Sequence, residues 1–93
     1  MRLDQFLRAS RLVVRRTIAQ ELCEAGAVLV NDVTARSSRA VRVGDEIMVR
    51  RRERILIARV LALPDSRNVS KSQAAALYEI VKDERPDDDA NTP

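Results

Sequence analysis

Hydrophobic residues recur at helical spacing at the start of the chain. Leu3, Phe6 and Leu7 fall on one helical face and predict a short helix over about Asp4–Ala9. Asp4 stands at its start and is the predicted N-cap, because a carboxylate can accept hydrogen bonds from the first free backbone N–H groups. The break at Ser10–Arg11 is expected to end this helix.

A second amphipathic helix is predicted over about Arg16–Ala25, and Gly26 fits the left-handed position that closes a helix. The side chains predicted to form its buried stripe are Ile18, Leu22 and Ala25. Those predicted to face water are Gln20, Glu21 and Glu24.

Short apolar runs and alternating positions follow, and they predict a small antiparallel sheet. Asn31–Asp32 tolerates positive φ and predicts a tight hairpin, while Gly44–Asp45 is a second turn signal. Pro64 is expected to end the last strand. The predicted strands are Val28–Val30, Val33–Ala35, Glu46–Arg50 and Ile55–Leu63, with Ile47 and Val49 facing inward and Arg51, Arg52 and Glu53 at a hairpin tip.

The C-terminal third predicts one more helix. Ser70 and Gln73 have the spacing of a capping box, and the helix behind them is expected to end near Lys82. Its predicted buried face is Ala74, Leu77, Tyr78 and Val81. Residues 83–93 are rich in acids and are predicted to be a disordered tail, so one α+β domain is expected over residues 1–82.

Composition argues against catalysis. The chain has no histidine and a single cysteine, so no His-based triad, His metal site or internal disulfide can form. Cys23 is expected to be a packing residue, because free cysteine usually behaves as a small buried hydrophobe. We therefore predict no enzymatic activity, no metal and no cofactor. The lack of a signal peptide or an apolar span predicts a cytoplasmic protein.

Charge points to an anionic partner. Residues 83–93 hold five acids and one Arg, so residues 1–82 carry 16 basic and 9 acidic side chains, a net charge of +7. The first sixteen residues contain five arginines and only one acid: the arginines are Arg2, Arg8, Arg11, Arg15 and Arg16. Crowded like charges suit phosphate binding, although a solvated helix face is the competing interpretation. The Arg50–Arg54 tip is interpreted as an auxiliary basic site, and an exposed hairpin tip kept soluble by charge is the competing interpretation.

The order of residues carries more information than the composition. The pattern reads Arg2-Leu3-Asp4-x-Phe6-Leu7, Ser10-Arg11-Leu12, Arg15-Arg16-Thr17-x-Ala19, Leu22, Gly26-x-Val28-x-Val30-Asn31, Ala35, Ser38, Val41 and Val43-Gly44-Asp45-x-Ile47. This pattern resembles the S4 RNA-binding domain over about Met1–Val49, with Asp32 where the domain usually has Gly. The resemblance implies an α-L fold, in which two helices pack on a small twisted antiparallel sheet.

The length, the second hairpin and the segment Ala74–Ile80 resemble the stand-alone bacterial S4 proteins of the RqcP family, which is similar to the S4-domain ribosome-associated heat-shock proteins. That likeness implies a role in ribosome-associated quality control. The expected partners are 23S ribosomal RNA and peptidyl-tRNA on a stalled large ribosomal subunit. An RqcH-like protein, which extends the stalled chain with alanine, is a third expected partner. We expect a monomer and no membrane contact.

The resemblance also implies which residues bind RNA. Arg2 and Arg16 are the strongest candidates, and Asp4 is expected to orient an arginine or to cap its helix. The other candidate contacts are Arg8, Arg11, Arg15, Thr17, Asn31, Arg36 and Ser38.

Three other functions compete with this one. The first is heat-shock-type recycling of obstructed large subunits without alanine tailing. The second is an enzyme, since S4 domains also accompany RNA-modifying catalytic domains, but this chain has no room for one. The third is a protein-interaction module in which the arginines meet an acidic partner.

Overall fold

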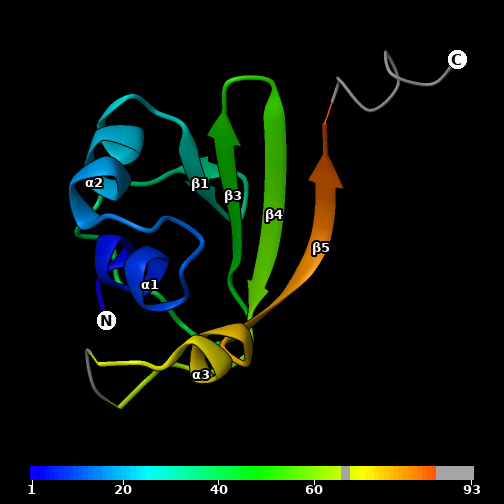
Figure 1. The fold of residues 1–93 in the computed structure, drawn as a ribbon. Coiled ribbons are helices and arrows are strands. Elements are labelled where there is room, and N and C mark those ends of the chain that lie inside the picture. The colour runs from blue at the N-terminus through cyan, green and yellow to red at the C-terminus, as the bar shows by residue number, and fades with distance from the viewer. Residues whose placement is uncertain (66–67, 86–93) are drawn as a thin grey trace, which may run out of the picture.

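The computed structural model describes residues 1–65 and 68–85, which form three helices and a five-stranded sheet (Figure 1). The helices are α1 (Leu3–Ala9), α2 (Arg16–Glu24) and α3 (Lys71–Ala75). The strands are β1 (Val28–Val30), β2 (Val33–Thr34), β3 (Glu46–Arg51), β4 (Arg54–Val60) and β5 (Tyr78–Glu84). All pairings are antiparallel, in the order β2-β1-β3-β4-β5. The predicted α+β arrangement is confirmed.

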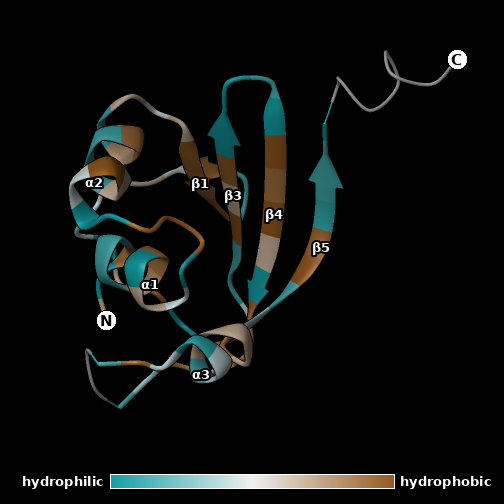
Figure 2. Ribbon diagram, in the orientation of Figure 1, coloured by the Kyte–Doolittle hydropathy of each residue, from teal (hydrophilic) through white to brown (hydrophobic). Residues whose placement is uncertain are grey.

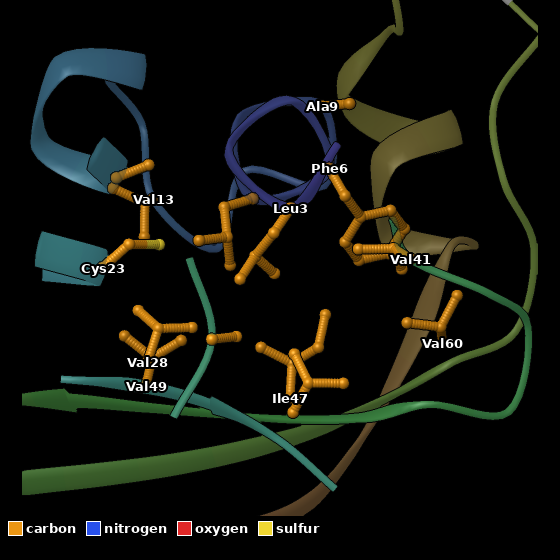
Figure 3. Packing of buried hydrophobic residues seen from close by; sticks show 14 of the residues in the cluster. Leu3, Phe6, Ala9, Val13, Cys23, Val28, Val41, Ile47, Val49 and Val60 are labelled. Atoms are coloured by element: carbon orange, nitrogen blue, oxygen red, sulfur yellow. The ribbon is translucent and has the colours of Figure 1, made fainter. Parts of the chain in front are cut away.

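The core lies between α1, α2 and the inner strands. Leu3 and Phe6 of α1 are fully buried: Leu3 points toward Ile47 of the sheet, and Phe6 lies beside Val41 (Figure 3). Burying each such side chain contributes roughly 1.5–3 kcal/mol. The apolar colour along β1, β3 and β4 ends at the β3–β4 hairpin tip, which is hydrophilic (Figure 2). No helix in residues 1–65 and 68–85 has the length and apolar character needed to cross a membrane.

The start of α1 differs from the prediction. Arg2, not Asp4, is the N-cap residue, and its backbone N–H donates to the Gln5 side-chain oxygen at 3.2 Å. The helix therefore begins at Leu3, two residues earlier than it would if Asp4 were the N-cap. Asp4 lies within the first turn, where its negative charge is favourable.

Helix α2 is rotated relative to its predicted orientation. Its fully packed residues are Ala19 and Cys23, while Ile18 and Leu22 are only partly buried. Ala25 is exposed, so its predicted burial is wrong. Small side chains at the line of contact let the helix approach the core closely. Gly26 closes the helix with a φ of +75°, as predicted.

The Asn31–Asp32 hairpin is confirmed. Both residues have positive φ, +51° and +68°, which is the combination that a two-residue turn of primed type requires. Asp32 therefore holds the turn in place of the usual glycine. The turn sets the register in which Val30 pairs with Val33.

The predicted C-terminal helix is largely wrong. Its start is correct, because the Gln73 N–H donates to the Ser70 hydroxyl at 3.2 Å and the Ser70 N–H donates to the Gln73 side chain at 3.0 Å. The helix stops at Ala75, however, and Tyr78–Glu84 forms β5 on the outer edge of β4. Strand pairing satisfies the outer backbone groups of β4, which a helix would leave unpaired.

Two predicted boundaries also move. β4 ends at Val60 rather than Leu63. β5 continues to Glu84, two residues past the predicted end of the domain. The rest of the predicted acidic tail, residues 86–93, lies outside the described residues.

Candidate nucleic-acid interface

The buried carboxylate of Asp4 organises the arginines at the N-terminal end. Its oxygens accept hydrogen bonds from Arg2 Nε at 3.1 Å, Arg16 Nε at 3.3 Å and Gln20 Nε2 at 3.0 Å. The Gln5 backbone N–H donates to the same group at 2.9 Å. The side chain of Asp4 has no exposed surface, so it positions other groups rather than touching a ligand itself.

The electrostatics of this cluster favour the charged form of Asp4. Burial alone would raise its pKa, but hydrogen bonds from Gln20, Arg2 and Arg16 outweigh burial and hold the pKa below its usual value. A carboxylate that stays ionised holds two permanently charged guanidinium groups through one edge of each.

Both arginines keep much of their surface free. The side chains of Arg2 and Arg16 are 44% and 41% exposed. A guanidinium has five N–H donors, and Arg16 uses only Nε–H in its bond to Asp4. The remaining donors are available to a phosphate, and the side chains lose less conformational freedom on binding because Asp4 already holds them.

The loop before β3 lies beside the start of α1. The Asp4 N–H donates to the Ser37 carbonyl at 3.1 Å and the Leu3 N–H donates to the Arg39 carbonyl at 2.8 Å. These bonds bring Arg36 and Ser38, both exposed, to the same end of the molecule as Arg2. The structure thus joins two predicted contacts to the cluster from a distant part of the sequence.

The remaining helix candidates are exposed. Arg8 and Arg11 line a shallow groove of about 490 Å³ between α1 and the segment 68–70. Arg11 has a φ of +62° and its Nη2 donates to the Val69 carbonyl at 3.3 Å, which fixes the side chain against that segment. Arg15 and Thr17 stand at the start of α2 and are exposed.

Outside the Asp4 cluster, the arginines near the helices and in the loop before β3 lack the ion pairs that the arginines of β4 have among the described residues. Arg8, Arg11, Arg15 and Arg36 form no ion pair with another described residue. On β4 and β5, by contrast, the charges are matched within the protein: Arg54 pairs with Asp83, and Arg59 with Glu46 and Glu79. Within the described residues, unpaired arginines therefore lie on the helices, on the adjoining loop and at the β3–β4 tip, whereas β4 and β5 balance their charges.

The polar side-chain atoms of Asn31, like those of Asp4, are already used within the protein. Its amide nitrogen donates to Asp45 at 3.1 Å, and its oxygen accepts from the Glu46 N–H at 3.0 Å. Both bonds tie the β1–β2 turn to the start of β3. The structure therefore gives Asn31 a role in holding the sheet together.

The hairpin tip 50–54 divides between two sides of the sheet. Arg54 is bound to Asp83, whereas Arg51 lines a groove beside α2 with Arg15 and Val14. Arg51 of the predicted auxiliary site thus adjoins the helical arginines, whereas Arg50 lies on the opposite face of the sheet and does not.

Gln20 is a site residue that the sequence analysis missed. It was predicted to face water, yet it is partly buried and donates to Asp4. Gln20 lies one helical turn after Arg16, and residues spaced i, i+4 share a helix face. That spacing could have linked it to the arginine.

The described residues contain no other site with reactive groups. Cys23 is buried, and burial, followed by the charges of Asp4 and Glu24, raises the pKa of its thiol. Within residues 1–65 and 68–85, no group of three or more His, Cys, Asp or Glu side chains is placed to hold a metal ion.

Comparison with known proteins agrees with this geometry. The S4 domain family matches residues 1–47, the part that contains the Asp4 cluster. The chain is 43% identical over 88 residues to the RQC P-site tRNA stabilizing factor of Listeria monocytogenes, covering 95% of this chain and 94% of that protein. It is 40% identical over 85 residues to the protein of the same name in Bacillus subtilis, covering 91% and 96%.

Two solved structures share the fold. The trimeric heat shock protein 15 of Vibrio cholerae superimposes with a TM-score of 0.78 and 28% identity, covering 87% of this chain and 81% of that one. The solution structure of the hypothetical protein HP1423 gives a TM-score of 0.76 and 32% identity, covering 90% and 100%. The chain belongs to the S4-domain family and, within it, to the RQC P-site tRNA stabilizing factors.

Proposed function

We propose that this protein binds RNA through the Asp4 cluster and acts in ribosome-associated quality control. The observation that carries the proposal is a buried carboxylate holding two half-exposed arginines, with further arginines nearby that form no ion pair within residues 1–65 and 68–85. The names of the relatives, which refer to the tRNA of the ribosomal P site, supply the biological setting. This role places the protein in the cytoplasm.

The physics of double-helical RNA suits such a surface. The deep, narrow major groove hides the base edges, so proteins recognise paired RNA by its shape and by phosphate and 2′-hydroxyl contacts. Guanidinium groups bind phosphate through two donors at once. Arg2 and Arg16, fixed by Asp4, would set the position of the domain on the RNA, while Arg8, Arg11, Arg15 and Arg36 would add affinity.

In its full form, the proposal names the stalled large ribosomal subunit that carries peptidyl-tRNA. The protein contacts 23S ribosomal RNA and the tRNA, and it supports an RqcH-like protein that extends the stalled chain with alanine. It acts as a monomer and contributes no catalytic step.

The test is sedimentation of a cell lysate through a sucrose gradient, with the protein detected by immunoblot. The wild-type protein should migrate with large subunits that carry tRNA, and the Arg16→Ala variant should stay at the top of the gradient. Arg50→Ala is the matched control, because it removes the same charge from an exposed position on the sheet. If the wild-type protein stays at the top of a low-salt gradient in which ribosomes are intact, the result contradicts the proposal.

The likeness to heat shock protein 15 favours a second candidate, recycling of obstructed large subunits without alanine tailing. The two functions differ in their dependence on the RqcH-like protein. Deleting its gene should abolish the cellular effect of this protein if tailing is its role. An undiminished effect in the deletion strain would favour recycling.

A further inference from the structure

Val14 is an exposed apolar residue in the middle of a basic surface. It is 75% exposed, although it follows Val13, which is almost fully buried. Val13 anchors the link between α1 and α2 in the core, and its neighbour is left facing out. A single exposed valine is ordinary, but its surroundings here are not.

Val14 forms part of a groove that joins distant segments. The groove has a volume of about 340 Å³ and is lined by Val13, Val14, Arg15, Ile18 and Arg51. Its wall on one side is the start of α2, and on the other it is the β3–β4 hairpin tip. Two positive charges thus flank an apolar floor.

The direction of Arg51 follows from the strand. Successive side chains of β3 point to opposite faces of the sheet. Ile47 and Val49 are buried against the helices, so Arg51 lies on the helix side and Arg50 on the other. Arg51 and Arg15 form no ion pair with any residue in the described part of the chain, so both charges remain available.

We propose that this groove holds one unpaired RNA nucleotide. Its phosphate lies between Arg15 and Arg51, and its base or ribose packs on Val14 and Ile18. Two cations beside an apolar floor match the chemistry of a nucleotide, and unstacked bases in RNA loops are the ones that proteins can reach. The inference rests on the proposed RNA-binding function. It adds to the proposed contacts with the RNA backbone a contact with one unpaired nucleotide.

A charge-matched pair of variants tests the phosphate contact. The probe is purified large ribosomal subunits with tRNA in the P site, and binding is measured between 50 and 200 mM KCl. Arg51→Ala should bind several-fold more weakly and reduce the log–log salt slope by about 1, whereas Arg50→Ala should match the wild type. Equal effects of the two variants would overturn the proposal.

A second pair tests the apolar floor. Val14→Ala should weaken binding roughly fivefold to tenfold without changing the salt slope. The substitution removes apolar surface that the bound nucleotide would cover, and it removes no charge. Val33→Ala is the control, since Val33 is 60% exposed on β2. A Val14→Ala variant that binds like Val33→Ala would overturn the proposal.

Crosslinking distinguishes the occupants. Replacing Val14 by photoreactive p-benzoylphenylalanine should give a crosslink to RNA at an unpaired nucleotide. A crosslink only to a ribosomal protein, or only to paired RNA, would contradict the inference. Arg16→Ala in the same assay separates the two claims: loss of binding there, with Arg51→Ala unaffected, would retain the proposed function and reject the groove.

Discussion

Asp4 couples the charge of one buried group to the position of two arginines. Its carboxylate accepts hydrogen bonds from Arg2, Arg16 and Gln20, and these bonds keep its pKa below the ordinary 3.8 of an aspartate. A group whose pKa is lower in the folded state stabilises the fold above its unfolded pKa, and this stabilisation is lost as the pH falls through the folded value.

The first prediction concerns the stability of Asp4→Asn. At pH 7 the variant should lose about 1–3 kcal/mol of unfolding free energy, because it leaves buried donors without an acceptor. The gap to the wild type should shrink as the pH falls below 3.8, because the wild-type carboxylate then begins to take up a proton and loses its stabilising charge. Urea unfolding at several pH values measures it, and a gap that is constant with pH would contradict the assigned role.

The second prediction separates positioning from direct contact. Gln20→Ala removes one hydrogen bond to Asp4 and no charge, so RNA binding should weaken while the salt slope stays that of the wild type. Arg16→Ala should instead reduce the slope by about 1. Glu21→Ala, an exposed change on the same helix, serves as the control for Gln20→Ala. Wild-type affinity in Gln20→Ala would show that Asp4 holds Arg16 without help.

At the scale of elements, β5 shows where sequence reasoning stops. Ala74, Leu77, Tyr78 and Val81 match helical spacing, but Tyr78–Glu84 is a strand. The deciding factor is the outer edge of β4, whose backbone groups need partners. Sequence spacing carries no information about that edge, which lies about 20 residues earlier in the chain.

The pairing of β4 with β5 also uses residues whose partners could not be identified from the sequence. Arg59 bonds to Glu79 at 2.6 Å and Arg54 to Asp83 at 3.0 Å. An irregularity between Ile57 and Ala58 leaves Val81 as the extra residue of a β-bulge. The sequence alone placed Glu79 in a predicted helix and Asp83 in the predicted acidic tail, so neither acid could be matched to an arginine of β4.

The third prediction follows from this edge. A chain truncated after Leu77 should form oligomers, because removing β5 exposes the backbone edge and apolar side chains of β4. A chain truncated after Arg85 keeps β5 and should stay monodisperse. Light scattering compares the two, and a monodisperse short chain with an unchanged melting temperature would contradict the stabilising role of β5.

Helix α2 was predicted in its bounds but not in its rotation. Ile18, Ala19, Leu22 and Cys23 form a broad apolar arc, and the pattern does not say which part of that arc touches the core. The structure buries the two small residues and leaves the larger ones at the margin. This rotation brings Gln20 to Asp4, so the same error hid a residue of the site.

At the scale of the whole molecule, positive charge is divided unevenly. The helices and the loop 36–39 carry arginines without counter-ions among the described residues, while β4 and β5 balance theirs internally. The sequence predicted the arginine cluster and the fold that presents it. It did not predict the ion pairs of β4 and β5, which neutralise the arginines at that edge of the sheet.

The fourth prediction uses this asymmetry. Each phosphate that the protein neutralises contributes about 0.9 to the log–log salt slope. Six contacts would give a slope of roughly −5, and the arginines counted are Arg2, Arg8, Arg11, Arg15, Arg16 and Arg36. Affinity for large subunits measured from 50 to 200 mM KCl gives the value. A log–log salt slope near zero would mean that these six arginines do not contact RNA phosphates.

The first residues of the chain are hydrogen-bonded to the loop that precedes β3. The Val41 N–H donates to the Met1 carbonyl at 2.9 Å, and Arg2 forms a bridge with Ala40. An affinity tag fused ahead of Met1 would therefore lie beside Arg2 and the other arginines proposed to bind RNA, and would obstruct them. β5 ends on the opposite edge of the molecule, so purification handles, fluorophores and surface attachments belong after the C-terminus (Figure 1).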